Sequence, residues 1–84
     1  MSELTMDGLA EIMRTAAGDD DNTKVQQNID DVPFTELGFD SLALLETVAL
    51  IKREHGVKLA DDELTDIKTP RELLERVNSE LARA

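Results

Sequence analysis

Ser41 and His55 are the residues most capable of nucleophilic chemistry in this sequence, which contains no cysteine. A serine nucleophile needs a base within hydrogen-bonding reach. His55, the single histidine, lies fourteen residues after Ser41, which is about 21 Å along a continuous helix. The run at 37–42 (Leu-Gly-Phe-Asp-Ser-Leu) is also not the G-x-S-x-G elbow of serine hydrolases. We therefore expect no catalytic residue and expect Ser41 to be acted upon by another protein.

The neighbours of Ser41 predict how its hydroxyl is presented. Gly38 allows a tight turn, Asp40 is a preferred helix N-cap, and residues 41–55 are rich in helix-forming leucine, alanine and glutamate. If the Asp40 carboxylate accepts from a backbone N–H of the first turn, the hydroxyl of Ser41 has no structural task. The alternative, in which Ser41 is itself the cap, stays open.

Phosphate and metal sites find little support in the sequence. There is no G-x-x-x-x-G-K-[ST] loop, and Asp40 would repel an anion bound at the helix start. The acidic run at 19–22 suggests a calcium loop, but the sixth position from Asp19 is Lys24 where an EF-hand requires glycine. We expect no metal site.

The run at 37–42 resembles the G-x-D-S-L attachment signature of acyl carrier proteins. The runs at 40–47 and 69–73 most resemble the discrete carrier proteins of bacterial type II (aromatic) polyketide synthases, and this resemblance covers almost the whole chain. The resemblance implies that Ser41 carries 4'-phosphopantetheine from coenzyme A, with Gly38, Asp40 and Leu42 as the flanking motif. The thiol of this group would carry malonyl and growing polyketide chains as thioesters, so the protein would be a carrier and not an enzyme.

The same resemblance implies transient partners. These are a phosphopantetheinyl transferase, a malonyl acyltransferase, a ketosynthase with its chain-length factor, and ketoreductase and cyclase enzymes. A fatty-acid or peptidyl carrier is the alternative within the family, and a non-carrier acidic helical adaptor that binds a basic protein is the alternative from another class. We predict that partners bind a set of side chains on and beyond the second helix: Leu42, Glu46, Leu50, Asp62 and Glu63.

Charge and composition limit the partners further. Nineteen acidic residues against nine basic ones give a formal net charge of −10, which argues against nucleic acid or an anionic membrane as a partner. No stretch approaches the length of a membrane span, and the N-terminal residues lack a signal-peptide pattern. We expect a cytoplasmic monomer that forms a single acyl carrier domain over residues 1–84.

Hydrophobic spacing predicts three substantial helices and one short one, with no strand pattern. The first spans about 6–17, begins at an N-cap on Thr5 and ends before Gly18. The second spans 41–55 and ends at Gly56, and Lys52 and Arg53 make its second half less acidic than in fatty-acid carriers. We place the following residues on its buried stripe: Leu44, Leu45, Val48 and Ile51. Its outward face is predicted to hold Glu46, Thr47, Leu50, Arg53 and Glu54.

The remaining elements complete the expected bundle. Residues 61–66 predict a short helix capped by Asp61 or Asp62, with Glu63 facing solvent. Thr69 and Glu72 form a capping box with proline between them, and the helix that follows has apolar positions at Leu73, Val77 and Leu81. The long loop at 19–39 needs apolar anchors, for which the candidates are Val25, Ile29, Val32 and Phe34. The fold class is therefore all-α: a small acyl-carrier-like bundle of three main helices and one short helix with a long first loop.

Overall fold

The computed structural model describes residues 3–17 and 29–83. Within these segments the chain forms four helices and no strand: α1 (Met6–Ala17), α2 (Ser41–His55), α3 (Asp61–Asp66) and α4 (Pro70–Arg83). The predicted all-α bundle is thereby confirmed. The predicted stop at Gly18, the acidic run at 19–22 and the loop anchor Val25 lie outside the described residues.

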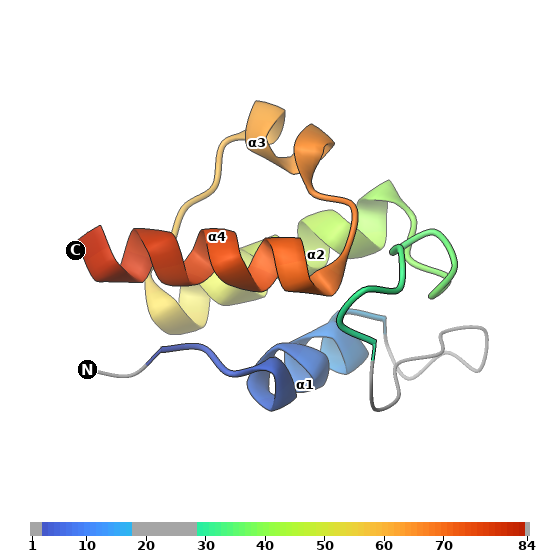
Figure 1. Ribbon diagram of the computed structural model, residues 1–84, viewed down its shortest axis with the longest axis horizontal. Helices are drawn as coiled ribbons and strands as arrows, with labels where there is room; N and C mark the ends of the chain where they lie inside the picture. Colours follow the sequence, from blue (N-terminus) through green and yellow to red (C-terminus); the bar gives the residue numbers. More distant parts are fainter. Residues whose placement is uncertain (1–2, 18–28, 84) are drawn as a thin grey trace.

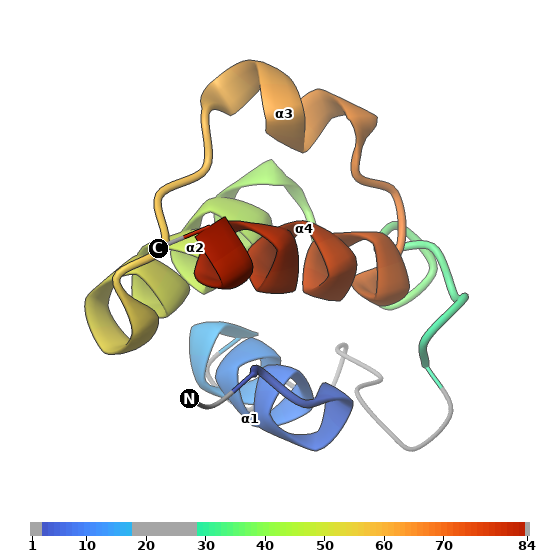
Figure 2. The ribbon, with the colours of Figure 1, turned by 60° about the vertical axis from the view of Figure 1, so that its left-hand side comes forward.

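The helices are stacked around one apolar centre. Helices α2 and α4 lie between α1 on one side and the short α3 on the other (Figures 1 and 2). Helix α1 packs against both α2 and α4. None of the helices in the described segments is long and apolar enough to cross a membrane.

The core is aliphatic apart from two phenylalanines and draws on every helix and on all three connecting segments. Burying apolar surface is the main source of stability in such a bundle, at roughly 25 cal/mol per Å². The buried hydrophobic residues of the described segments are Leu4, Leu9, Ala10, Ile12, Met13, Ile29, Phe34, Leu37, Phe39, Val48, Ile51, Val57, Leu59, Leu64, Ile67, Leu73 and Val77. Of the predicted loop anchors, Ile29 and Phe34 are buried and Val32 is partly buried. Leu37 and Phe39 are also buried, and the hydrophobic pattern did not predict them as loop anchors.

Local capping chemistry sets the helix boundaries largely as predicted. The Thr5 hydroxyl accepts from the Gly8 N–H at the start of α1. Gly56 ends α2 with φ 73°, and its N–H donates to the Lys52 carbonyl oxygen. At the start of α4, the Glu72 N–H donates to the Thr69 hydroxyl and the Thr69 N–H donates to a Glu72 carboxylate oxygen, which completes the capping box.

The rotation of α2 about its axis differs from the prediction. Leu45 was placed in the core but is 49% exposed, whereas Thr47 was placed outside and is 0% exposed. Leu50 was also placed outside, yet it is partly buried and packs against the core. The polar side chain of Thr47 is tolerated because its hydroxyl donates to the Ala43 carbonyl oxygen one turn earlier. The buried face of α2 is thus rotated from the stripe expected from its leucines.

The start of α3 also corrects the sequence-based prediction. Ala60 is the N-cap residue and provides no side-chain hydrogen bond, so the N-cap position does not fall at Asp61 or Asp62 as predicted. The chain enters α3 from an extended segment in which Leu59 is buried, and Leu64 and Ile67 are buried as predicted. This short helix is held by its apolar contacts rather than by capping.

Candidate functional site

The segment before Ser41 is a compact turn that reverses at Gly38. The Leu37 N–H donates to the Pro33 and Phe34 carbonyl oxygens, and the Phe39 N–H returns to the Phe34 carbonyl oxygen at 2.9 Å. Gly38 has φ 83°, a left-handed conformation that is costly for residues with a Cβ. The turn brings the rings of Phe34 and Phe39 to 5.9 Å between centroids in the core. Gly38 therefore provides the reversal that the sequence predicted.

Asp40 caps α2 and leaves Ser41 to solvent. One Asp40 carboxylate oxygen accepts from the Ala43 N–H at 2.8 Å, and the Asp40 carbonyl oxygen accepts from the Leu44 N–H. Ser41 is the first residue of α2 and is exposed. Among the described residues, no hydrogen bond involves the Ser41 hydroxyl. The alternative in which Ser41 is the N-cap is therefore wrong.

Two sets of bonds fasten this segment to the start of α4. The Phe34 N–H donates to the Lys68 carbonyl oxygen, and the Arg71 N–H donates to the Asp30 carbonyl oxygen at 2.8 Å. The Arg71 guanidinium also binds both carboxylate oxygens of Asp31, at 2.7 and 3.2 Å. This hydrogen-bonded guanidinium holds the pKa of the Asp31 carboxyl below its ordinary value. The segment that leads into the turn before Ser41 is thus tied to the start of α4 by backbone and side-chain bonds.

Ser41 lies at the edge of an apolar groove between α2 and α3. The groove has a volume of about 330 Å³ and is lined by Ser41, Leu44, Leu45, Leu64 and Thr65. A cavity of this size and composition suits a small apolar group. Leu45 was predicted to lie in the core and not to line this groove. Its spacing could have predicted this position, because a residue four positions after Ser41 lies on the same side of the helix.

The predicted partner-binding residues divide into exposed and partly buried ones. Leu42 is 68% exposed, and Glu46 and Asp62 are also exposed. Leu50 packs partly against the core, which makes it a poorer candidate for docking than Leu42. Glu63 was expected to face solvent, but it is partly buried, and its Oε2 atom has no hydrogen-bond partner among the described residues. The short α3 brings this carboxylate close to the body of the bundle because it packs through Leu64.

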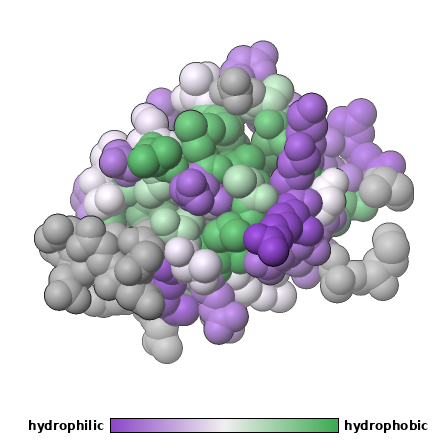
Figure 3. Space-filling view, turned by 180° about the vertical axis from the view of Figure 1, so that it is seen from behind, coloured by the Kyte–Doolittle hydropathy of each residue, from purple (hydrophilic) through white to green (hydrophobic). Residues whose placement is uncertain are grey.

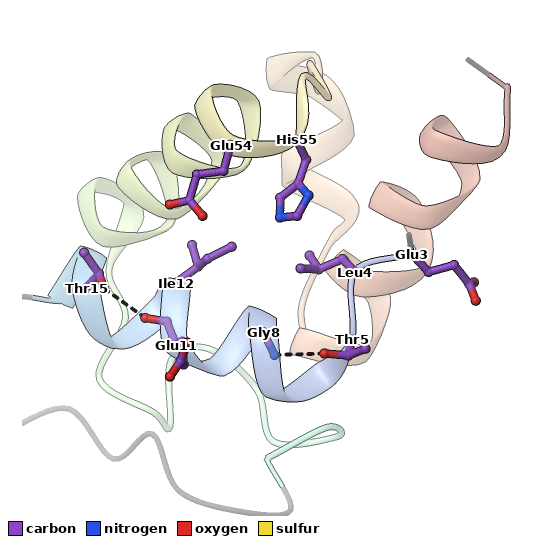
Figure 4. Close-up of a pocket in the computed structure, with 9 residues that line it drawn as sticks. All are labelled: Glu3, Leu4, Thr5, Gly8, Glu11, Ile12, Thr15, Glu54 and His55. Carbon is purple, nitrogen blue, oxygen red and sulfur yellow. Dashed lines mark hydrogen bonds between the residues drawn. The ribbon is translucent and has the colours of Figure 1, made fainter. Parts of the chain in front are cut away.

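A second cleft, of about 310 Å³, lies between the end of α2 and one side of α1 with the residues before it, and Ser41 does not line it. Figure 4 shows the side chains of Glu54 and His55 directed from α2 toward Ile12 and Leu4. His55 therefore lines this cleft, whereas Ser41 lines the groove beside α3. No cluster of three or more metal-ligating side chains occurs within residues 3–17 and 29–83. The cleft that His55 lines is therefore separate from the groove beside Ser41.

Comparisons with known proteins agree with this geometry. The family model described as the phosphopantetheine attachment site matches residues 7–77. The granaticin polyketide synthase acyl carrier protein of Streptomyces violaceoruber is 48% identical over 84 residues, which cover 100% of this chain and 99% of the relative.

Solved structures of the actinorhodin carrier from Streptomyces coelicolor are also similar. Its octanoyl form has a TM-score of 0.89 at 40% identity and covers 99% of this chain and 96% of the other. Its holo form has a TM-score of 0.84 at 40% identity with the same coverage. The holo structure and the family model together support a covalently attached phosphopantetheine group, and members of this family are carriers rather than catalysts. The chain belongs to the phosphopantetheine-attachment family and, within it, to the acyl carrier proteins of type II polyketide synthases.

Proposed function

We propose that Ser41 is the attachment residue of the 4'-phosphopantetheine group. The observation that carries this proposal is the division of tasks at the start of α2. Asp40 caps the helix, and Ser41 places an exposed hydroxyl at the edge of the apolar groove. The first turn of a helix has unpaired backbone N–H groups, a setting that favours an attached phosphodiester by about 0.3–1 kcal/mol at an exposed site. The residues present therefore fit the group, although Asp40 opposes the added charge.

The chain's own residues present the hydroxyl and do not activate it. Gly38 shapes the turn, Asp40 fixes the helix start, and the ties from Arg71 hold the preceding segment. The base that removes the Ser41 proton must come from the phosphopantetheinyl transferase. The attached group supplies a thiol for thioesters of malonyl and growing polyketide chains. The groove walls, Leu44, Leu45 and Leu64 among them, are placed to shelter the first part of an acyl chain.

We propose that synthase enzymes bind this carrier transiently. The expected partners are the transferase, a malonyl acyltransferase, a ketosynthase with its chain-length factor, and ketoreductase and cyclase enzymes. Leu42 offers apolar area beside Ser41, and Glu46 and Asp62 offer negative charge, with Glu63 contributing less because it is partly buried. The protein acts in the cytoplasm as a monomer whose residues 1–84 form one carrier domain.

Transferase loading tests the attachment residue. The apo-protein is incubated with coenzyme A, Mg²⁺ and a broad-specificity phosphopantetheinyl transferase, and the intact mass is then measured. We expect the wild type to gain one phosphopantetheine group and Ser41→Ala to gain none. Ser79→Ala is the matched control, because Ser79 is an exposed serine on α4, and this variant should load like the wild type. Full loading of Ser41→Ala would refute the proposal.

A further inference from the structure

Six exposed residues of α2 lie on one side of the helix, starting beside Ser41. Their spacing of three, four, seven, ten and eleven positions places them along a single stripe. We call this stripe the α2 strip, and its members are Leu42, Leu45, Glu46, Ala49, Lys52 and Arg53. With Leu42 68% and Leu45 49% exposed, the strip holds both of the large hydrophobic side chains that are exposed among the described residues. It is therefore the strongest candidate surface for contact with a partner.

The charge of the α2 strip changes from negative to positive along the helix. Its first half has the two leucines and Glu46, and its last turn has Lys52 and Arg53. Arg53 lies seven positions after Glu46, so at 1.5 Å per residue the two charges are separated by about 10 Å along the axis. Seen from behind, hydrophobic side chains gather over the first part of α2 and below α3, and hydrophilic ones dominate toward the end of α2 (Figure 3). The strip is thus apolar and acidic near Ser41 and basic at its far end.

Neighbouring elements strengthen this arrangement at both ends. On α3, which forms one wall of the groove, Asp62 is exposed, and Lys58 is exposed just after α2. Glu54 would neutralise the basic end if it lay on the strip, but Figure 4 shows its side chain directed toward α1. The positive charge of Lys52 and Arg53 therefore faces solvent in a protein whose formal net charge is −10.

These charges act on orientation more than on affinity. An exposed ion pair contributes little by itself, and the apolar contact of the leucines provides most of the attraction. Placing like charges opposite each other is costly, however, so a partner turned end for end would bring its cation against Lys52 and Arg53. A strip whose charged residues all had the same sign would not distinguish the two orientations of the partner in this way.

We infer that the α2 strip is a two-signed docking surface that fixes the orientation of a synthase enzyme on this carrier. Its occupant is an enzyme surface with a basic side chain and an apolar patch beside the mouth of its active site, and an acidic side chain about 10 Å farther away. In this orientation the group on Ser41 points at the active site. The inference rests on the proposed function, since the orientation matters only if Ser41 carries the transferred group.

Charge reversal at the basic end tests the strip. The double variant Lys52→Glu/Arg53→Glu is compared with Arg14→Glu/Arg76→Glu, which alters net charge by the same amount at exposed positions on α1 and α4. Both variants are loaded with phosphopantetheine and then acylated with malonyl. Each malonyl carrier is then the substrate of a ketosynthase with its chain-length factor from a type II polyketide synthase. The readouts are loading by intact mass, melting temperature, and KM and kcat for the carrier.

We expect both variants to load fully and the strip variant to raise KM about fivefold or more, against less than about twofold for the control. The ratio of the two KM values should shrink when NaCl is raised from about 0.01 M to about 0.15 M, because the Debye length falls from about 30 Å to about 8 Å. Equal KM values for the two variants, or a lower KM for the strip variant, would refute the docking role of the α2 strip and leave the proposed function of Ser41 standing. Failure of the wild type to load at Ser41 would instead overturn the proposed function and the strip with it.

Discussion

The rotation of α2 can be tested by placing the same charge at two neighbouring positions with opposite environments. Thr47→Glu introduces a carboxylate where the side chain is 0% exposed, and Leu45→Glu introduces it where the side chain is 49% exposed. Glutamate is a good helix former, so intrinsic helix propensity does not explain a loss in either variant. The two variants also have the same net charge.

The expected magnitudes differ by several fold. At Thr47 the longer side chain overpacks the core, at about 1–3 kcal/mol, and burying the carboxylate adds several kcal/mol. An 84-residue domain has a total stability of about 4–13 kcal/mol, so this variant should be largely unfolded or strongly destabilised. At Leu45 only about half of a leucine's burial is lost, or about 1 kcal/mol, which lowers the melting temperature by about 4–8 °C.

Thermal and urea unfolding followed by far-ultraviolet circular dichroism measures both effects. Thr47→Val is the control for shape, because it removes the hydroxyl that donates to Ala43 but keeps the side-chain volume, and it should stay within about 1.5 kcal/mol of the wild type. If Leu45→Glu were as destabilising as Thr47→Glu, or if Thr47→Glu melted near the wild type, the orientation of α2 would be wrong.

Three further predictions concern individual hydrogen bonds of the fold and of the site. Asn78→Ala removes the bonds to the Leu4 N–H and carbonyl oxygen, at 2.8 and 2.9 Å, and should cost about 2 kcal/mol in urea unfolding; Asn78→Asp keeps the acceptor but sets a carboxylate oxygen against the Leu4 carbonyl oxygen, so it should not restore the wild-type stability. Asp40→Ala removes the α2 cap and should cost about 1 kcal/mol and slow transferase loading in a timed mass assay; unchanged stability and loading would contradict its capping role. Asp31→Asn should lower the melting temperature at neutral pH. Because the Arg71 hydrogen bond depresses the folded pKa of Asp31, its stabilisation is present above about pH 4 and is lost as pH falls through that depressed pKa, so the two melting curves should converge in acid; a constant difference would refute the pairing.

Features governed by local chemistry were predictable from the sequence. The caps at Thr5 and Asp40, the stop at Gly56 and the capping box at Thr69 each depend on residues within a few positions of one another. Such bonds form wherever the local backbone allows them, so their residue types indicate the boundary directly. The same reasoning located Ser41 at the first turn of an exposed helix start.

Features that depend on distant contacts were not predictable in this way. Asn78 looks like an ordinary polar residue of α4, yet it binds Leu4, 74 positions away. Thr47 looks like a surface residue by its type, yet it is fully buried in the packed bundle. Leu37 and Phe39 are buried by a turn that no periodic pattern describes. The rotation of α2, and with it the exposed strip, could therefore be read only from the packed structure.

Locating the attached group on the chain tests the central claim most directly. The loaded wild-type protein is digested, and tandem mass spectrometry identifies the residue that bears the phosphodiester. The sequence contains three serines, Ser2, Ser41 and Ser79, so the fragments can distinguish every serine candidate. We predict a single modified residue, Ser41. A phosphopantetheine group on any other residue, or none on the chain after treatment with an active transferase, would contradict the account.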